Sequence, residues 1–406
     1  MLCQFTVKNY QCLKNETTFD MQAANISEHS DSLIESLDGE KFLPLGVIYG
    51  PNGSGKSTLL YALYALVCKI MRPICAVGCN NQECAKRSSS VSINPFKFSK
   101  FYVNQPTEYE LFFRTEKNEY QYNISILKDK ILKEELHKKA LSGYRYSLLF
   151  KRDGVTNITL KGTLKNYSCD GISENLPLLS FLGITHRRNA TINDIVKWFE
   201  NSIDFINYGN PAEDAHIPIA ESKKLKTLIL KMMKEMDIDI SDYRTEKSAD
   251  KIKVFTSHMV ENDEYELELF EESNGTIKVF GILPHVADSL LSGTTLVIDE
   301  LDAKLHPLLL KYIIDLFRNP EINKKGAQLI FTSHDLSTMN SSTFRRDEIW
   351  FVAKGEDKSS KLYSLIEFKS DDGRTERKDA SYNKRYLEGH YGADPYFQRI
   401  INWGEY

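Results

Sequence analysis

Residues 50–57, Gly-Pro-Asn-Gly-Ser-Gly-Lys-Ser, constrain the fold of this chain more than any other segment. They lie between an apolar run at 41–49, which reads as a buried strand, and an apolar segment at 58–67, which predicts a helix. A G-x-x-x-x-G-K-[ST] loop in that position encloses an anion, because its glycines let backbone N–H groups point inward and the helix N-terminus adds positive charge. The alternative, a chance glycine-rich turn, does not account for the strand and helix on either side.

The loop predicts a binding site for the phosphates of ATP. We expect Lys56 to reach the β- and γ-phosphates and to take part in catalysis, and the Ser57 hydroxyl to ligate Mg²⁺. The residues predicted to contact the nucleotide in this loop are Gly50, Pro51, Asn52, Gly53, Ser54, Gly55, Lys56, Ser57 and Thr58.

A second apolar strand, predicted at 294–298, ends in the carboxylates Asp299 and Glu300. Asp299 fits the acid that holds Mg²⁺ directly or through water, and Glu300 is placed to act as the catalytic base that polarises the attacking water. An Asp-Glu pair also begins many helices, which is the alternative for the pair taken alone. Downstream of a phosphate-binding loop, the catalytic interpretation is favoured.

Further positions are candidate contacts to the nucleotide. Asp302 follows the acidic pair, and His334 follows an apolar strand predicted at 328–332, where its imidazole can reach the γ-phosphate or the attacking water. Ser273 and Gly275 lie in a turn that enters a predicted helix, whose N-terminus can receive an anion. Taken alone, His334 reads as a loop histidine and Ser273 as an ordinary helix cap.

The composition is that of a folded, soluble chain. Of 406 residues, 41% are hydrophobic and 27% charged, and the formal net charge is -4, which excludes a disordered chain and a generally basic nucleic-acid binder. No apolar run approaches about 18 residues and no secretory signal is evident, so we expect a cytoplasmic protein with no membrane span. Seven cysteines without framework spacing predict reduced thiols. Zinc binding by Cys68, Cys75, Cys79 and Cys84 is the weaker alternative, because none of them forms a C-x2-C pair.

The middle of the chain combines helical patterns with one hairpin. Residues 151–163 predict a hairpin that turns at Asp153-Gly154. Thr191 and Asp194 have the spacing of a capping box ahead of one predicted helix, and residues 223–236 predict a second helix with a broad apolar face.

The order of these motifs resembles that of ABC-type, AAA-class ATPase heads, a group that includes the SMC and OLD-like proteins. The phosphate loop is followed by the Ser273-x-Gly275 signature, the acidic strand at 296–300, Asp302 and His334. The sequence is closer still to ATPases of bacterial abortive-infection systems of the AbiLi/RloA type and to the ATPase subunit of PARIS-like systems. The shared stretches are FTVKNY, ESNGTIKVFGILP, VIDELDAKLHP, FTSHD and RYLEGHYGADPY.

The resemblance implies a homodimer, or a higher homo-oligomer, that closes head to tail around ATP. Ser273 and Gly275 of one protomer would then meet the γ-phosphate held by Lys56 of another. The resemblance also implies a sensor or switch role in anti-phage defence, reset by hydrolysis. The chain departs from the family at the expected Q-loop glutamine, for which Asn94 and Gln105 are the nearest candidates.

The effector of such a switch is expected to be a separate chain, a TOPRIM-like or RloB-like nuclease or toxin. Too few residues follow Asp335 to form the nuclease domain of OLD-type proteins, and no HNH-like or paired-acid nuclease cluster is evident. Nucleic acid and phage proteins are further candidate partners. Two alternatives stay open: a DNA-repair-type ATPase that clamps DNA without a toxin partner, and a scaffold that binds ATP without turnover.

We therefore predict an α/β P-loop ATPase head with a mixed sheet, a flanking antiparallel β-subdomain and a mainly helical insertion. The first half of the head, with the phosphate loop, is predicted at 1–140 and the insertion at 141–250. The second half, with the signature, the acidic strand and His334, is predicted at 251–369 and is followed by a tail at 370–406. The insertion shows no sustained heptad pattern, which excludes a long coiled coil. The aromatic, basic tail fits a partner-docking surface and a segment packed on its own domain equally well.

Overall fold

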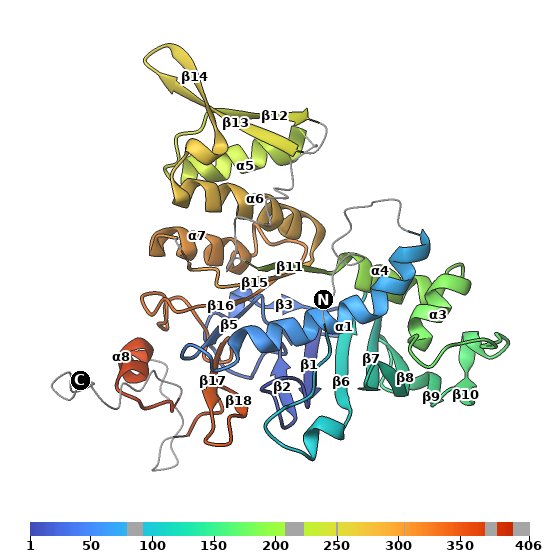
Figure 1. Ribbon diagram of the computed structural model, residues 1–406. Helices are drawn as coiled ribbons and strands as arrows, with labels where there is room; N and C mark the ends of the chain where they lie inside the picture. Colours follow the sequence, from blue (N-terminus) through green and yellow to red (C-terminus); the bar gives the residue numbers. More distant parts are fainter. Residues whose placement is uncertain (79–91, 208–222, 249–250, 304, 370–379, 393–406) are drawn as a thin grey trace, which may run out of the picture.

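The computed structural model of the chain describes residues 1–78, 92–207, 223–248, 251–303, 305–369 and 380–392. Two large sheets organise the molecule (Figure 1). A six-stranded, mostly parallel core sheet leads into the phosphate-binding loop, and a seven-stranded antiparallel sheet packs against one side of it together with helix α1. The predicted α/β head, with a mixed sheet beside an antiparallel subdomain, is confirmed.

The core sheet has the strand order β11-β15-β16-β5-β17-β18. Its first five strands are parallel, and β18 pairs antiparallel with β17 at one edge. Every residue of β5, β15 and β16 is buried, as expected for parallel strands covered on both faces. The strands are β5 (Leu45–Tyr49), β11 (Ile203–Asn207), β15 (Thr295–Asp299), β16 (Gln328–Thr332), β17 (Ile349–Lys354) and β18 (Ser360–Ser364).

Helices cover both faces of the core sheet, because alternate strand residues point to opposite sides. Val297 and Ile330 join the apolar cluster that contains α1, whereas Leu296 and Leu329 join the cluster of α5, α6 and α7. Figure 1 shows α5, α6 and α7 stacked on the side away from α1. The helices are α1 (Lys56–Gly78), α3 (Leu178–Thr185), α4 (Ala190–Asn201), α5 (Lys223–Glu235), α6 (Asn274–Ser292), α7 (Pro307–Arg318) and α8 (Tyr382–Leu387), with 3-10 turns η1 (Ser30–Ser32), η2 (Tyr102–Asn104), η3 (Gly162–Leu164) and η4 (Leu269–Glu271).

Helix α1 is the central helix of the fold. Among the described residues it alone has the length and hydropathy of a membrane-crossing helix, and 61% of that apolar window is buried inside the protein. Its apolar character is therefore that of a core helix. Cys68 and Cys75 are buried on α1, while Cys79 and Cys84 lie outside the described residues. In the part of the chain that the structure describes, no group of three or more His, Cys, Asp or Glu side chains could hold a metal.

The antiparallel sheet has the order β10-β9-β8-β7-β6-β1-β2. The predicted hairpin at 151–163 is confirmed by β9 and β10, which pair at its edge. The buried amide of Gln328 joins the two sheets, because it accepts a hydrogen bond from Leu2 N (2.8 Å) and donates one to Leu2 O (3.0 Å). The strands are β1 (Leu2–Lys8), β2 (Thr17–Asp20), β6 (Thr107–Arg114), β7 (Asn118–Leu127), β8 (Lys130–Ala140), β9 (Ser147–Asp153) and β10 (Asn157–Leu160), with a small separate pair β3 (Ile34–Glu35) and β4 (Lys41–Phe42).

Between residues 141 and 250 the structure places α3, α4 and α5 together with β9, β10, β11 and β12, so this stretch supplies strands to both large sheets. The predicted capping box of Thr191 and Asp194 is wrong. Helix α4 begins at Ala190, and the side chain of Asn189 accepts hydrogen bonds from Thr191 N (3.0 Å) and Ile192 N (3.2 Å). Asparagine is as good an N-cap as threonine, and it stands at the position where the helix starts.

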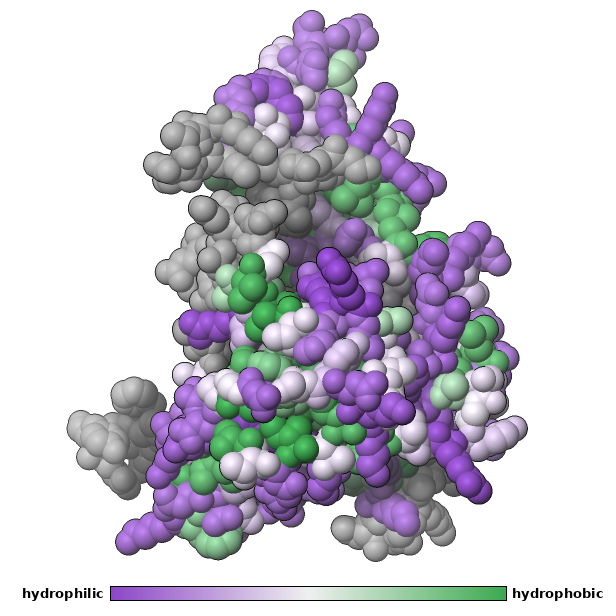
Figure 2. Space-filling view, turned by 90° about the vertical axis from the view of Figure 1, so that its right-hand side faces the viewer, coloured by the Kyte–Doolittle hydropathy of each residue, from purple (hydrophilic) through white to green (hydrophobic). Residues whose placement is uncertain are grey.

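A three-stranded antiparallel sheet projects beyond α5 and α6 (Figure 1). Its strands are β12 (Asp242–Ser248), β13 (Lys251–Val260) and β14 (Asp263–Glu268). On the face shown in Figure 2, hydrophilic residues cover most of this projection, and hydrophobic residues gather over the body below it. Strand β14 of this sheet leads directly into η4 and α6, so the sheet helps to position the start of α6.

The described part of the tail packs on the head. Tyr386 and Tyr391 stack on Phe351 of β17, with ring centroids 5.6 and 4.9 Å apart. Both tyrosines are buried in the same apolar cluster as α6 and α7. A partner-docking role for 370–406 stays a prediction, because most of that segment lies outside the described residues.

Candidate nucleotide site

The carboxyl ends of β5, β15 and β16 meet at one edge of the core sheet. The phosphate-binding loop follows β5, Glu300 follows β15, and the segment leading to His334 follows β16. Adjacent parallel strands bring residues from distant parts of the sequence together at such an edge, which is where open α/β sheets bind ligands.

The loop at 50–57 is held by neighbouring elements, which leave no room for side chains at Gly50 and Gly55. Gly55 has φ +111°, and a Cβ atom there would lie 2.7 Å from Cys12 Sγ and 2.7 Å from Ser360 Oγ. The Ser360 hydroxyl also donates a hydrogen bond to Ser54 O. Glycine is therefore required by backbone conformation and by contact, and the loop is held in shape by elements outside it.

Lys56 is buried at the floor of this loop. Its Nζ donates to Gly50 O (2.8 Å) and to Pro51 O (3.2 Å). Burial lowers the pKa of Lys56 to about 8, an effect that the nearby Asp299 carboxylate partly offsets. The buried Ser54 hydroxyl has no hydrogen-bond partner among the described residues. The loop therefore encloses the Lys56 ammonium group and the unpaired Ser54 hydroxyl, which can both donate further hydrogen bonds. These donors fit the phosphates of ATP.

Asp299, at the end of β15, is hydrogen-bonded to residues at both of the other strand ends. Its Oδ1 accepts hydrogen bonds from Ser57 Oγ (3.0 Å) and from Thr332 Oγ1 (2.7 Å). A serine hydroxyl beside a carboxylate is an all-oxygen donor set of the kind that Mg²⁺ prefers. Ser57 and Asp299 are thus the residues that fit the cation.

The backbone of Glu300 is held in an uncommon conformation. Its φ is +56°, in the left-handed region that non-glycine residues rarely adopt. Its N–H donates to Thr332 Oγ1 (2.7 Å), and its carbonyl accepts from Lys278 Nζ (3.2 Å), which also donates to Ala303 O. Strained residues that are fixed from both sides are common at functional sites, and this one carries the predicted base.

Asp302 and His334 are brought together by the backbone. His334 N donates to Asp302 Oδ2 at 2.9 Å, while Asp302 Oδ1 is buried without a partner among the described residues. Partial desolvation, followed by the positive charge of Lys56, lowers the pKa of His334. The imidazole is therefore neutral at pH 7 and can accept a hydrogen bond.

Ser273 and Gly275 stand at the start of α6. Ser273 is the exposed N-cap of α6, and its Oγ accepts from Thr276 N at 3.1 Å. The preceding Glu272 is fixed by His258 Nε2 (2.7 Å) of β13. The structure brings the loop, Asp299, Glu300, Asp302 and His334 to one edge, whereas in the described part of the chain the hydrogen bonds of the Ser273 side chain are with Thr276 alone.

Sequence reasoning missed Thr332 and Lys278. Thr332 left no signal in the sequence, because the pairing of β16 with β15 that brings it to Asp299 is set by the tertiary structure. Lys278 gave no signal, since a lysine in a predicted helix is ordinarily exposed, and this one is buried. Of the Q-loop candidates, Asn94 lies beside the loop after β1, where its carbonyl accepts from Gln11 N at 2.8 Å.

The class defined by this arrangement is a P-loop ATPase domain. One edge of a parallel sheet carries a phosphate-binding loop, an acidic strand end and a third strand end that leads to a histidine. Residues 45–340 match the family described as "AAA domain, putative AbiEii toxin, Type IV TA system". The chain belongs to this family, which confirms the predicted relationship to abortive-infection ATPases. A comparison with curated proteins gives no significant match.

Solved structures with related architecture include heads of SMC proteins. The "SMC head domain from Thermotoga maritima" is 13% identical, with a TM-score of 0.41 over 89% of this chain and 98% of that one. An SMC head bound to the C-terminal winged-helix domain of ScpA is 14% identical, with a TM-score of 0.40 over 89% and 97%. An SMC head with an extended coiled coil, bound to a ScpA domain from Pyrococcus furiosus, is 13% identical, with a TM-score of 0.42 over 89% and 96%. We draw no functional conclusion from similarity at this level.

Proposed function

We propose that this protein is a Mg²⁺-dependent ATPase that acts as the sensor or switch subunit of a bacterial anti-phage system and controls a separate nuclease or toxin. The family description, which names a toxin–antitoxin system, supports the biological setting. The arrangement at the edge of the core sheet supports the chemistry. On this proposal the protein works in the cytoplasm.

One observation carries the ATPase proposal: Asp299 Oδ1 accepts from Ser57 and from Thr332 at the same time. Asp299 thus lies against the Ser57 hydroxyl at the end of the phosphate-binding loop, as expected for two ligands of one metal ion. When bound, Mg²⁺ would neutralise the negative charge that develops on the phosphate groups. Ser57 and Asp299 would hold the ion.

The remaining residues have distinct tasks in this proposal. Lys56 Nζ exchanges its hydrogen bonds to the carbonyls of Gly50 and Pro51 for bonds to the β- and γ-phosphates. Charged phosphate oxygens are stronger acceptors than backbone carbonyls. Glu300 accepts the proton of the attacking water, and its backbone bonds aim the carboxylate. His334, kept neutral by its lowered pKa, accepts or donates one hydrogen bond at the γ-phosphate or water.

Closure of two copies completes the site. Ser273 is exposed at the N-terminus of a 19-residue helix, where a hydroxyl and free backbone N–H groups favour an anion. Because the described contacts of Ser273 stay within α6, its partner phosphate is proposed to come from a second protomer. ATP binding would then favour the closed assembly, and hydrolysis would release it.

The test compares wild type with Glu300→Gln. Mass is followed by light scattering with and without Mg-ATP, and ATP turnover is measured in parallel. We expect the variant to stop hydrolysing and to accumulate an ATP-held assembly. Equal hydrolysis by both proteins, or no change of mass with ATP, would contradict the assignment of the base or the switch.

The defence role needs its own test in cells. Plating of phage is compared between cells that carry the chain with its neighbouring genes and cells that carry Lys56→Ala. Protection by wild type and none by Lys56→Ala is expected. If both plate phage alike while ATPase activity is intact in vitro, the ATPase proposal stands and the anti-phage role fails.

A further inference from the structure

A large cavity in the described part of the protein lies at the opposite edge of the core sheet from the phosphate-binding loop. Its volume is about 890 Å³, and its floor is formed by Gly293 and Gly326, which precede β15 and β16. Both strands run from this floor to the nucleotide site, a distance of roughly 15 Å for five residues. The cavity is therefore separate from the candidate nucleotide site.

Lysines dominate the walls of this cavity. They are Lys117, Lys138, Lys197, Lys324 and Lys325. Lys324 lies 4.0 Å from Glu321, and the other four make no ion pair with any described residue. Three carboxylates share the walls, those of Glu35, Glu116 and Asp194. Ammonium groups that line one cavity without carboxylate partners leave a positive field that an anionic ligand would neutralise.

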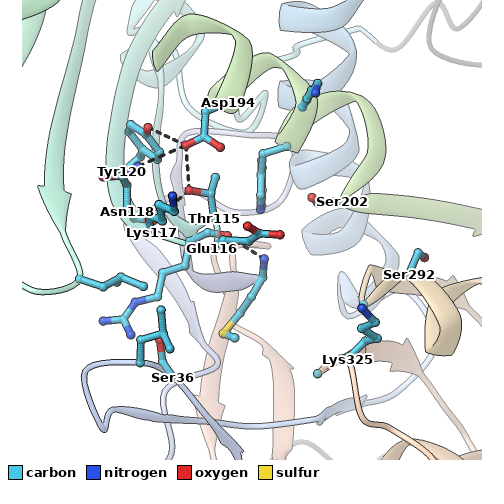
Figure 3. A pocket seen from close by; sticks show the side chains of 18 of the residues that line it. Ser36, Thr115, Glu116, Lys117, Asn118, Tyr120, Asp194, Ser202, Ser292 and Lys325 are labelled. Atoms are coloured by element: carbon cyan, nitrogen blue, oxygen red, sulfur yellow. Dashed lines mark hydrogen bonds between the residues drawn. The ribbon is translucent and has the colours of Figure 1, made fainter. Parts of the chain in front are cut away.

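The best-fixed carboxylate of the cavity is already satisfied by neutral donors. Asp194 Oδ2 accepts from Thr115 Oγ1 (2.8 Å), Tyr120 OH (2.9 Å) and Asn118 Nδ2 (3.4 Å). Figure 3 shows this group on one wall and Lys325 with Ser292 on the facing wall. Asp194 is thus anchored to its own wall and is not the counter-ion of the lysines.

The start of helix α4 adds to the positive field. Ala190 and Thr191, the first residues of this 12-residue helix, line the cavity. A helix N-terminus carries a partial positive charge and favours phosphate or carboxylate groups. It acts here beside the four unpaired lysines, so two independent sources of charge point to the same ligand chemistry.

The floor of the cavity is closely packed. Gly293 has φ +77°, and a Cβ atom there would lie 2.5 Å from Lys325 O. The turn that ends α6 is therefore packed directly on the turn that carries Lys325. A preformed floor is typical of small-ligand sites, whose volumes usually run from about 300 to 1,000 Å³.

We propose that this cavity binds a small polyanion of nucleotide size that carries two or more phosphate groups. Lys117, Lys197 and Lys325 reach it from β6–β7, α4 and the turn before β16. The site does not depend on the proposed ATPase activity. The same strands and α6 connect it to the nucleotide site, so the cavity is placed to report a bound ligand to that site.

Tripolyphosphate is the probe, and Lys56→Ala is the background, so that the phosphate-binding loop does not capture it. Binding is measured by isothermal titration calorimetry. The pocket variant carries Lys117→Gln, Lys197→Gln and Lys325→Gln. The control carries Lys224→Gln, Lys231→Gln and Lys234→Gln on α5, which removes the same charge from an exposed surface. We expect saturable binding at one site per chain, weakened at least tenfold in the pocket variant and by less than twofold in the control.

Three outcomes would overturn the proposal. The first is no binding of tripolyphosphate to the Lys56→Ala protein. The second is equal weakening in the two triple variants, which would show only general charge attraction. The third is binding of duplex DNA with the same lysine dependence but no binding of tripolyphosphate, which would make the surface a nucleic-acid contact. Circular dichroism of each variant confirms that it is folded.

Discussion

The Thr332 hydroxyl lies 2.7 Å from Asp299 Oδ1, donating to it, and accepts a hydrogen bond from the backbone nitrogen of Glu300, also at 2.7 Å. One buried side chain therefore fixes the candidate metal acid and the candidate base relative to each other. Neither contact is visible in the order of the motifs, because Thr332 belongs to a different strand. The hydrogen bond from Glu300 N to Thr332 Oγ1 helps to hold Glu300 at its positive φ.

Replacing Thr332 with valine keeps the shape of the side chain and removes both hydrogen bonds. Asp299 would lose one of its orienting donors, and groups of this kind typically cost about 10- to 100-fold in activity when lost. We expect ATP turnover to fall by that range, with a raised requirement for Mg²⁺. The control is Thr295→Val, which removes a buried hydroxyl bonded to Gln328 at the other end of β15. Similar turnover in the two variants would contradict a positioning role for Thr332.

Lys278→Met tests the bond between the signature helix and the carbonyl of Glu300. The long apolar chain of methionine fills the same space but cannot donate to Glu300 O or Ala303 O. We expect kcat to fall about tenfold with KM for ATP nearly unchanged, since the bond orients the base and does not bind the nucleotide. Lys231→Met, on the exposed face of α5, should leave both constants as they are. A rise in KM alone would assign Lys278 to binding instead.

Ser273→Asp separates helix capping from contact with a phosphate. Aspartate caps helices as well as serine, so α6 should start at the same residue, but its charge repels a γ-phosphate brought by a second protomer. We expect ATP binding to a single chain to persist, while ATP-dependent assembly and hydrolysis are lost. Ser273→Asn keeps the cap without the charge and should retain assembly. Assembly by the aspartate variant, measured by light scattering, would place the signature outside the interface.

The lowered pKa of Lys56 predicts that ATP binding takes up protons. With a pKa of about 8, about half of the free protein has a neutral amine at pH 8 and about a tenth at pH 7. Bound phosphates favour the charged form, so the sign is uptake, and the amount should rise with pH across this range. Calorimetry in buffers of different ionisation enthalpy measures it. Lys56→Arg, which stays charged, should show no such increase, and a pH-independent wild type would mean that Lys56 is charged before ATP binds.

Much of the candidate site could be predicted because its motifs are local. The glycine spacing of the loop, followed by Lys56, specifies an anion-binding site through backbone geometry alone. Asp299 and Glu300 are recognised by the apolar strand that they follow. The same holds for Ser273, which the structure shows as the N-cap of α6. Strand β11, within residues 141–250, was harder to predict from the sequence. It pairs with β15, far away in the sequence, and no local pattern indicates that pairing.

The capping error at α4 has a similar cause. Thr191 and Asp194 have the right spacing, but Asn189 is also a capping residue, and only the packed helix decides which of them stands at the start. Asp194 is instead drawn to Thr115 and Tyr120 of the antiparallel sheet. A spacing rule cannot see donors that arrive from another sheet.

By itself, the sequence determined that the chain is a P-loop ATPase of α/β architecture, since strand periodicity and the loop at 50–57 act over short distances. Only the tertiary structure decided that Thr332 would bridge Asp299 and Glu300, that Lys278 would be buried against their loop, and that five lysines would surround one cavity. Those contacts depend on strand order and on side-chain packing between segments separated by tens to hundreds of residues. Hydrogen bonds and charges act over a few ångströms in space, and the fold alone sets those distances.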